Sequence, residues 1–234
     1  MPTEDLLLRP AEQGDLAAVA EVHLAARAHA VPAMPALVHT PEEVRAFHAG
    51  LDLGERDLWV AEIHRVVGYA ELKGDWLDDL YVHPDAQGRG IGSALLDLVK
   101  SLRPEGFCLW VFESNTGARR FYARHGLVEL ERTDGSGNEE KAPDVRMAWP
   151  GREPLVFYRR LIDDVDEQLG DLLARRAALT RAVQGHKADP ARDPDREQEI
   201  AAALARRAPA LGHDRLARIV HAIITESLDA AAEI

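Results

Sequence analysis

Short apolar stretches with a period of two dominate the first part of the chain. Residues 58–63, 66–72 and 77–82 show this alternation and predict three antiparallel strands, the first two joined by a tight turn at His64 and Arg65. Residues 6–10 and 145–149 predict an opening and a closing strand.

Two helix starts lie between these strands. Asp15 is predicted as the N-cap of an amphipathic helix. Thr40, Pro41 and Glu43 predict a second start, because Thr40 can cap the helix, Pro41 fits its first turn and Glu43 completes a capping box. Residues 30–39, with two prolines, form a loop that could either shape a substrate entrance or simply connect the helices.

The last part of the chain has a period of three to four. Neither proline nor strand alternation interrupts the first apolar series, which predicts one helix of about 45–50 Å. Asp193 and Pro194 predict the start of a second helix that ends near Ala208, and a third is predicted over residues 213–232. The apolar series are Val165, Leu169, Leu172, Leu173, Leu179 and Val183 in the first helix and Leu216, Ile219, Val220, Ile223 and Ile224 in the third.

The chain length and a cluster of prolines and glycine near residue 150 predict two domains. Pro150, Gly151 and Pro154 interrupt regular structure, and 234 residues suit two modest domains better than one. We therefore expect domains at residues 1–150 and 151–234.

Charge and cysteine content narrow the classes of partner. The net charge is −12, and residues from Arg152 onward hold 13 Lys and Arg against 15 Asp and Glu, so the acidic excess falls mainly on the first part. Such a surface repels phosphate backbones and argues against nucleic acid as the main partner. The single Cys108 fits a reducing cytoplasm. The N-terminus does not resemble a signal peptide, and no stretch approaches the roughly 20 apolar residues that span a membrane.

A loop with Gly88, Gly90 and Gly92 follows the third of the three predicted antiparallel strands. Its glycines allow close approach of a ligand, and the helix that follows adds positive potential, so the loop can hold a pyrophosphate. A Walker loop would need Gly-Lys-Ser/Thr, which is absent here. A dinucleotide fingerprint would need a parallel strand unit around it, whereas the preceding strands are predicted as hairpins. A glycine-rich turn without a ligand is the remaining alternative.

Two segments carry a resemblance to a known family. Gln87-x-x-Gly90-x-Gly92, preceded by residues 80–84, resembles motif A of the GNAT acetyltransferases. Residues 115–127 are similar to that family's Asn-x-x-Ala-x-x-Phe-Tyr-x-x-x-Gly-Phe segment, with Leu127 in place of the usual Phe. The resemblance implies an α/β (α+β) domain with a mixed, mostly antiparallel sheet.

The same resemblance implies the chemistry of this domain. Acetyl-CoA would be the cosubstrate, and the Val82 amide would polarise its acetyl carbonyl. Asn115 would contact the pantetheine arm, and Tyr122 would protonate the departing thiolate, which has a basicity similar to that of a phenol. The pyrophosphate would bind the loop residues Gln87, Gly88, Arg89, Gly90 and Gly92.

The general base and the amine acceptor stay open at this point. Glu71, Asp78 and Asp79 lie on strands that lead to the acetyl site and are candidates for the base. The acidic excess favours a cationic amine as acceptor.

Three cations on the first long helix have informative spacing. Arg176 and Lys187 are eleven residues apart, so they share one stripe with Cα atoms roughly 16 Å apart and could bracket a small dianion. Arg159 lies about 25 Å before Arg176 and roughly 100° around the axis. If all three serve one pocket, Arg159 must come from a second copy of the chain, and the protein is a homodimer.

Residues 158–227 resemble the all-helical chorismate mutases, whose three-helix protomers intertwine as dimers. The resemblance implies that Arg159, Arg176 and Lys187 bind the carboxylates and ether oxygen of chorismate, with no metal. It places Asp193 and Glu197 near the ring hydroxyl, and it makes Arg196 and Ser227 further substrate-binding residues.

One position departs from the mutase pattern. The family usually has Gln or Glu four residues after the serine, where it hydrogen-bonds the ether oxygen, and this chain has Ala231. The sequence thus predicts a two-domain enzyme, an N-acetyltransferase and a chorismate mutase that makes prephenate for aromatic amino acid biosynthesis. The alternatives are a catalytically silent helical domain that dimerises or senses a ligand, and a mutase acting on 4-amino-4-deoxychorismate.

Overall fold

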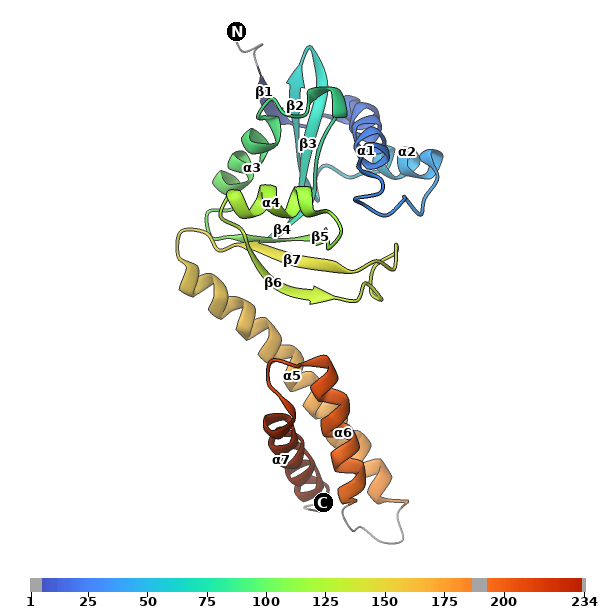
Figure 1. The fold of residues 1–234 in the computed structure, drawn as a ribbon, viewed down its shortest axis with the longest axis vertical. Coiled ribbons are helices and arrows are strands. Elements are labelled where there is room, and N and C mark those ends of the chain that lie inside the picture. The colour runs from blue at the N-terminus through green and yellow to red at the C-terminus, as the bar shows by residue number, and fades with distance from the viewer. Residues whose placement is uncertain (1–5, 187–192, 233–234) are drawn as a thin grey trace. The chain divides into compact units, whose positions relative to one another are not determined.

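The computed structural model describes residues 6–186 and 193–232. The chain forms two compact units, Met1–Tyr158 and Arg159–Ile234, and each is described by itself (Figure 1). Within the described residues, no helix is both long and apolar enough to cross a membrane.

The first unit is built on a seven-stranded sheet of order β1-β2-β3-β4-β5-β7-β6. Neighbouring strands are antiparallel except β4 and β5, which run parallel. This mixed, mostly antiparallel sheet confirms the predicted fold class. The strands are β1 (Leu7–Pro10), β2 (Asp57–Ile63), β3 (Arg65–Lys73), β4 (Trp76–Val82), β5 (Phe107–Phe112), β6 (Val128–Thr133) and β7 (Asp144–Trp149).

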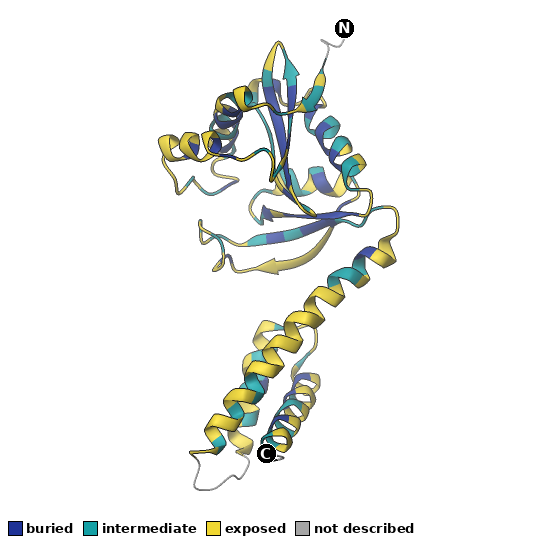
Figure 2. Cartoon of the chain, turned by 180° about the vertical axis from the view of Figure 1, so that it is seen from behind, coloured by how far each residue is buried: buried dark blue, intermediate teal, exposed yellow. Residues whose placement is uncertain are grey.

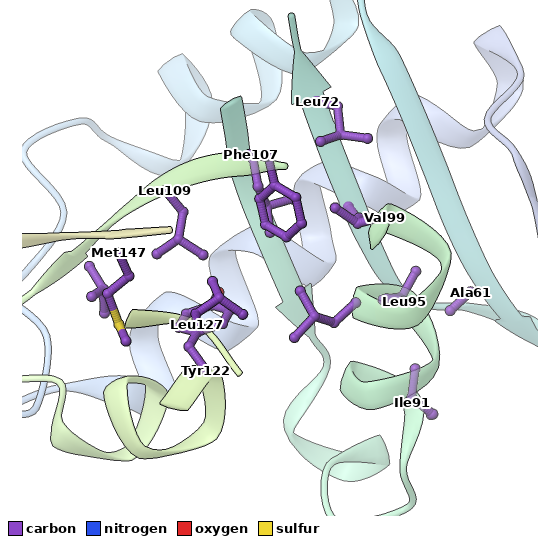
Figure 3. Packing of buried hydrophobic residues seen from close by; sticks show 14 of the residues in the cluster. Ala61, Leu72, Ile91, Leu95, Val99, Phe107, Leu109, Tyr122, Leu127 and Met147 are labelled. Carbon is purple, nitrogen blue, oxygen red and sulfur yellow. The ribbon is translucent and has the colours of Figure 1, made fainter. Parts of the chain in front are cut away.

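Helices flank this sheet on both faces (Figure 1). They are α1 (Leu16–Ala30), α2 (Pro41–Ala49), α3 (Ile91–Leu102) and α4 (Thr116–Arg124), with short 3₁₀ segments at Gln13–Asp15 and Pro84–Ala86. Leu16, Val19 and Val22 of α1 pack with Val60 and Tyr69 of the sheet in one cluster. A larger cluster joins α3 and α4 to the sheet through residues shown in Figure 3, among them Ile91, Leu95, Val99, Phe107, Leu109 and Tyr122.

The two predicted helix starts have different outcomes. At α2 the capping box is confirmed: the Glu43 amide donates to Thr40 Oγ1 at 3.3 Å, and the Thr40 amide donates to Glu43 Oε2 at 2.8 Å. At α1 Asp15 holds the predicted N-cap position, but its side chain makes no cap hydrogen bond. The carboxylate instead accepts hydrogen bonds from the Arg9 guanidinium at 2.6 and 2.8 Å, a stronger, charge-assisted partner.

The second unit is all-helical. It comprises most of α5 (Pro154–Gln184), then α6 (Pro194–Arg207) and α7 (His213–Ala232). The long first helix and the bounds of the third are as predicted. Ala201 of α6 and Leu216 and Val220 of α7 are buried, whereas Ile219 is 44% exposed and was wrongly assigned to the core stripe.

Helix α5 begins in the first unit, where Phe157 is 2% exposed. Beyond it the helix is mostly exposed, as Figure 2 shows. Its apolar residues lie in solvent rather than in a core, with exposed fractions between 37% and 61% for Ile162, Val165, Leu169, Leu172, Leu173, Leu179 and Val183. A helix with such a stripe needs a partner surface to bury it.

Candidate functional site

Strands β4 and β5 part from each other, and this opening makes the main cavity of the first unit. Their pairing is recorded at Trp76 and Cys108, near the start of both strands. The cavity beyond it has a volume of about 1300 Å³ and is lined by β4, β5, α1, α2, α4 and the loops before α2 and β7. Parted parallel strands can admit a ligand between them, where main-chain groups have lost their sheet partners.

The glycine-dense loop lies between the end of β4 and the start of α3. Gly88 and Gly90 have φ angles of +75° and +82°, and a Cβ atom added to either would meet nothing within 4 Å. Gly90 is the N-cap of α3 and brings no capping side chain, so the first amides of the helix face the loop without one. An open backbone at a helix N-terminus has the properties that a pyrophosphate requires.

The amide of Val82, at the end of β4, points away from β3. Gly68 and Val82 are register partners, and the His83 amide donates to the Val67 carbonyl at 2.8 Å. Gly68 and Val82 are therefore a non-hydrogen-bonded pair, and the Val82 amide points away from β3 toward the opening. The Gln87 side chain donates to the Val82 carbonyl at 3.0 Å and braces the same turn.

Helix α4 presents Asn115 and Tyr122 to the cavity. Asn115 is its N-cap, and its side-chain oxygen accepts from the Ala118 amide at 3.1 Å. Tyr122 is 9% exposed. Burial raises the pKa of its phenol above the ordinary value of 10.0, so the hydroxyl keeps its proton at neutral pH. It can act as a proton donor to a group that forms in the cavity.

The three carboxylates predicted as candidate bases differ in environment. Glu71 is 2% exposed and forms an ion pair with Arg56; burial raises its pKa despite that partner. Asp78 and Asp79 line the cavity. Burial, with the charge of Asp79 second, raises the pKa of Asp78. Burial would also raise the pKa of Asp79, but hydrogen bonds from His23 and Tyr69 outweigh it and hold that pKa low.

A hydrogen-bonded chain of polar side chains beside this cavity was not predicted, although Asp79 had been named as a candidate base. His23, Tyr69 and Asp79 form a chain in which His23 Nδ1 lies 2.8 Å from Tyr69 Oη, and Tyr69 Oη donates to Asp79 Oδ2 at 2.8 Å. They come from α1, β3 and β4, so sequence spacing gave no sign of them. The only local signal was the i,i+4 spacing of His23 and Arg27 on one face of an amphipathic helix.

Two loops meet at the rim of the cavity. Arg27 is 6% exposed and donates to Glu140 Oε1 at 2.7 Å and to the Pro35 carbonyl at 3.4 Å. His39 and Glu139 lie 2.9 Å apart. These contacts join the loop before α2 to the loop before β7, so both loops border the same opening.

In the second unit, one predicted cation is anchored between helices. The Arg176 guanidinium of α5 donates to Ser227 Oγ of α7 at 2.7 Å and lies 3.4 Å from the Ile223 carbonyl. Ser227 is 7% exposed and itself donates to the Ile223 carbonyl at 2.6 Å. The serine thereby fixes the direction of the arginine.

Four of the predicted mutase residues line one pocket of about 330 Å³, namely Arg176, Asp193, Arg196 and Glu197. Asp193 caps α6, with its carboxylate accepting from the Arg196 amide at 3.0 Å. The Arg196 side chain pairs with Glu199 at 2.8 Å, and Glu197 lies 3.6 Å from the His221 ring. The pocket thus combines cationic and anionic side chains over apolar walls.

Arg159 and Ser227 are not among the residues that line this pocket. Arg159 is exposed on the continuous helix α5, seventeen residues before Arg176, which corresponds to about 25 Å of helix. Lys187 lies outside the described residues. Ala231 lies on α7 near its end. Among the residues that the structure describes, no three His, Cys, Asp or Glu side chains are grouped to hold a metal ion.

Comparison with known families assigns both units. Residues 54–129 match the family described as acetyltransferase (GNAT) domain, and residues 158–231 match chorismate mutase type II. The peptidyl-lysine N-acetyltransferase YjaB of Salmonella typhimurium is 33% identical over 100 residues, covering 42% of this chain and 68% of that protein. YjaB of Escherichia coli is 33% identical over 101 residues with the same coverage.

Solved structures share the fold of the first unit. The solution structure of apo YjaB from Escherichia coli has a TM-score of 0.53 at 23% identity, covering 63% of this chain and 99% of that one. The PaiA N-acetyltransferase of Thermoplasma acidophilum, solved with coenzyme A, has a TM-score of 0.50 at 20% identity, covering 62% and 99%.

Proposed function

The chain belongs to the GNAT acetyltransferase family and carries a type II chorismate mutase domain after it, and from this we propose a cytoplasmic, homodimeric enzyme with two activities. The domain at residues 1–150 transfers an acetyl group from acetyl-CoA to an amine. The domain at residues 151–234 converts chorismate to prephenate and thereby serves aromatic amino acid biosynthesis.

The fit of acetyl-CoA rests on the open loop at the N-terminus of α3. Gly88 and Gly90 leave space for phosphate oxygens, and the helix dipole favours their charge. In this proposal Gln87, Arg89 and Gly92 complete the binding loop, and Asn115 holds the pantetheine arm. Acetyl-CoA supplies the thioester that reacts.

The parting of β4 and β5 is the observation that carries the acetyl-transfer proposal. The Val82 amide, directed into this opening, stabilises the oxyanion that forms as the amine attacks the acetyl carbonyl. Tyr122 gives its proton to the departing thiolate; burial raises the pKa of its phenol, which therefore stays protonated until the thiolate forms.

The acceptor we propose is the ε-amine of a lysine side chain in a peptide. The YjaB relatives are peptidyl-lysine N-acetyltransferases, which supports it. The cavity is also strongly acidic, as an ammonium ligand requires, since Glu43, Asp78, Asp79, Glu139, Glu140 and Asp144 all line it.

Incubation with acetyl-CoA and a lysine-containing peptide tests this proposal by mass spectrometry. We expect the acetylated peptide, and we expect Tyr122→Phe to lower kcat by about 10²-fold or more while acetyl-CoA still stabilises the protein. Acetyl-CoA binding without acetylation of any lysine peptide would exclude this acceptor, and absence of acetyl-CoA binding would exclude the activity.

The mutase proposal rests on the pocket that gathers Arg176, Asp193, Arg196 and Glu197. The rearrangement needs no nucleophile; the protein selects a compact substrate conformer and stabilises charge on the ether oxygen. Arg176 binds a carboxylate, with Ser227 fixing its direction, and Lys187 supplies charge at the ether oxygen. Arg159 is too far along the same helix and enters the pocket from the partner subunit. The exposed apolar stripe of α5 supports that dimer.

Ala231 favours a second candidate, a mutase-like domain that binds chorismate or 4-amino-4-deoxychorismate without converting it. One missing transition-state donor costs roughly 2.7–4 kcal/mol, or about 10²–10³ in rate. The loss of chorismate absorbance separates the two functions. We expect slow turnover that rises by that factor in Ala231→Gln but not in Ala230→Gln. Binding without turnover in all three proteins would establish the silent, ligand-sensing function.

A further inference from the structure

His23 occupies the position of a base in the acetyl-transfer cavity. It lies on α1, its side chain is 15% exposed, and it lines the cavity together with Asp79, Tyr81 and Tyr122. Tyr122 lies on α4 and belongs to the larger core cluster. His23 lies on α1, whose apolar residues form the smaller cluster with β2 and β3. The two side chains can therefore act on a reaction centre from opposite faces of the sheet.

The hydrogen-bond chain determines the tautomer of the His23 ring. Asp79 is ionised and can only accept, so the single proton of the Tyr69 hydroxyl goes to Asp79. The contact of 2.8 Å between Tyr69 Oη and His23 Nδ1 then needs a proton on Nδ1. A neutral imidazole with hydrogen on Nδ1 has its lone pair on Nε2. The chain from Asp79 thus makes Nε2 the basic atom and orients the ring.

The groups that face His23 come from the sheet, from α1 and from α2. Tyr69 and Asp79 face it from the sheet, and Tyr81 faces it at 4.9 Å between ring centroids. His48 of α2 lies 5.3 Å from it, also between centroids. Burial lowers the pKa of His48, so this neighbour adds no positive charge at neutral pH. Arg27, one turn further along α1, pairs with Glu140. After His23 takes up a proton, the carboxylate of Asp79 offsets the new charge.

The other titratable groups of this region are less suitable. Glu71 is held in its ion pair with Arg56, and the low pKa of Asp79 makes that carboxylate a weak base. Among the rim residues, the side chains of Glu43 and Glu139 are 62% and 71% exposed and face solvent. Glu140 is held in its ion pair with Arg27. Asp144 accepts hydrogen bonds from Thr133 and Asn138. Asp78 is then the main competitor as the base.

We propose that His23 is the general base of the acetyl transfer, with Tyr69 and Asp79 as its positioning residues. The inference rests on the acetyltransferase function proposed above. The acceptor binds as the ammonium ion and first releases one proton to water. The nitrogen of the resulting neutral amine then bonds to the acetyl carbon, and a second proton passes from it to His23 Nε2. The carbon–sulfur bond breaks, Tyr122 gives its proton to sulfur, and coenzyme A leaves as the thiol. Exchange with water returns the proton from His23 to the Tyr122 phenolate.

His23→Asn tests the assignment, because the asparagine amide can still donate toward Tyr69 but offers no basic nitrogen. His29→Asn is the matched control, an exposed histidine on the same helix. With acetyl-CoA and a lysine peptide, we expect kcat to fall about 10²–10⁴-fold in His23→Asn and to stay unchanged in His29→Asn. Stabilisation by acetyl-CoA should be the same in all three proteins. The acidic limb of the kcat/KM profile should disappear in His23→Asn, and added imidazole should restore activity to His23→Ala.

A kcat for His23→Asn within about threefold of the wild type, with the same pH profile, would overturn the assignment and leave the acetyltransferase intact. A fall in kcat without a change of pH profile and without imidazole rescue would reduce His23 to a structural role. A wild-type protein that binds acetyl-CoA but acetylates no amine would overturn both the base and the proposed function. Loss of activity and of the acidic limb in Asp78→Asn instead would assign the base to Asp78.

Discussion

The exposed stripe of α5 makes a quantitative prediction for Leu172→Asp. Leu172 is 61% exposed in the single chain. Complete burial of a leucine side chain is worth about 1.5–3 kcal/mol, so burial of the exposed part in a dimer contributes about 1–2 kcal/mol per protomer. A two-fold symmetric interface contains this residue twice, which gives about 2–4 kcal/mol. Removal of both contributions should weaken the dimer roughly 30- to 1,000-fold, and the unpaired carboxylate adds to that loss.

Sedimentation equilibrium over a range of concentrations measures this effect directly. Leu211→Asp is the matched control, because Leu211 is 43% exposed and lies in the turn between α6 and α7 rather than on α5. We expect a dimer for the wild type and for the control, and a monomer for Leu172→Asp at the same concentration. A wild-type protein that is monomeric at micromolar concentration would refute the proposed dimer, as would equal dissociation constants for the wild type and Leu172→Asp. In either case Arg159 could not complete the pocket of another copy.

Three further predictions concern single residues of the first unit. Gly90→Glu should abolish stabilisation by acetyl-CoA in thermal unfolding, because it adds a carboxylate and a strained φ of +82° at the anion-binding loop, and stabilisation equal to that of the wild type would contradict this. Gly106→Ala should lower the free energy of unfolding by at least about 2 kcal/mol, since its φ is +106° and the new Cβ would overlap the Phe157 ring. An unchanged denaturation midpoint would argue against it. Asp15→Asn should reduce the loss of stability at acid pH, because the hydrogen bond from Arg9 lowers the Asp15 pKa below its ordinary 3.8. The contribution of Asp15 to the free energy of unfolding is complete above pH 3.8 and is lost as the pH falls through the lower folded pKa. An unchanged loss of stability at acid pH in urea titrations would show that other groups cause it.

Local signals in the sequence predicted most of the elements. The capping box at Thr40 and the cap at Asp193 depend on neighbouring residues only, and both were read correctly. Strand β6 was not predicted: it lies at the edge of the sheet with all its residues exposed, so it has no buried face to impose a clear pattern. Asp15 holds the predicted N-cap position, but its carboxylate pairs with Arg9 on the strand before it rather than with the helix amides.

The sites depended on longer-range arrangements. Family motifs indicated Tyr122 and the loop at Gly90, and helix periodicity placed Arg159 and Arg176 far apart on one helix. The chain His23–Tyr69–Asp79 joins residues up to 56 positions apart, and only the pairing of β3 with β4 and the packing of α1 on them bring it together. Periodicity likewise placed Ile219 on the core stripe of the third helix, whereas the structure leaves it exposed.

The opening between β4 and β5 has an evolutionary consequence. A main-chain amide, unlike a side chain, survives every ordinary amino acid replacement except proline, so drift in the sequence of β4 leaves an amide-based oxyanion site intact. The walls that select an acceptor are made of side chains from α1, α2 and two loops, and apart from His23 these can diverge freely. A scaffold built this way can acquire new acceptors by a few substitutions while its reaction stays the same.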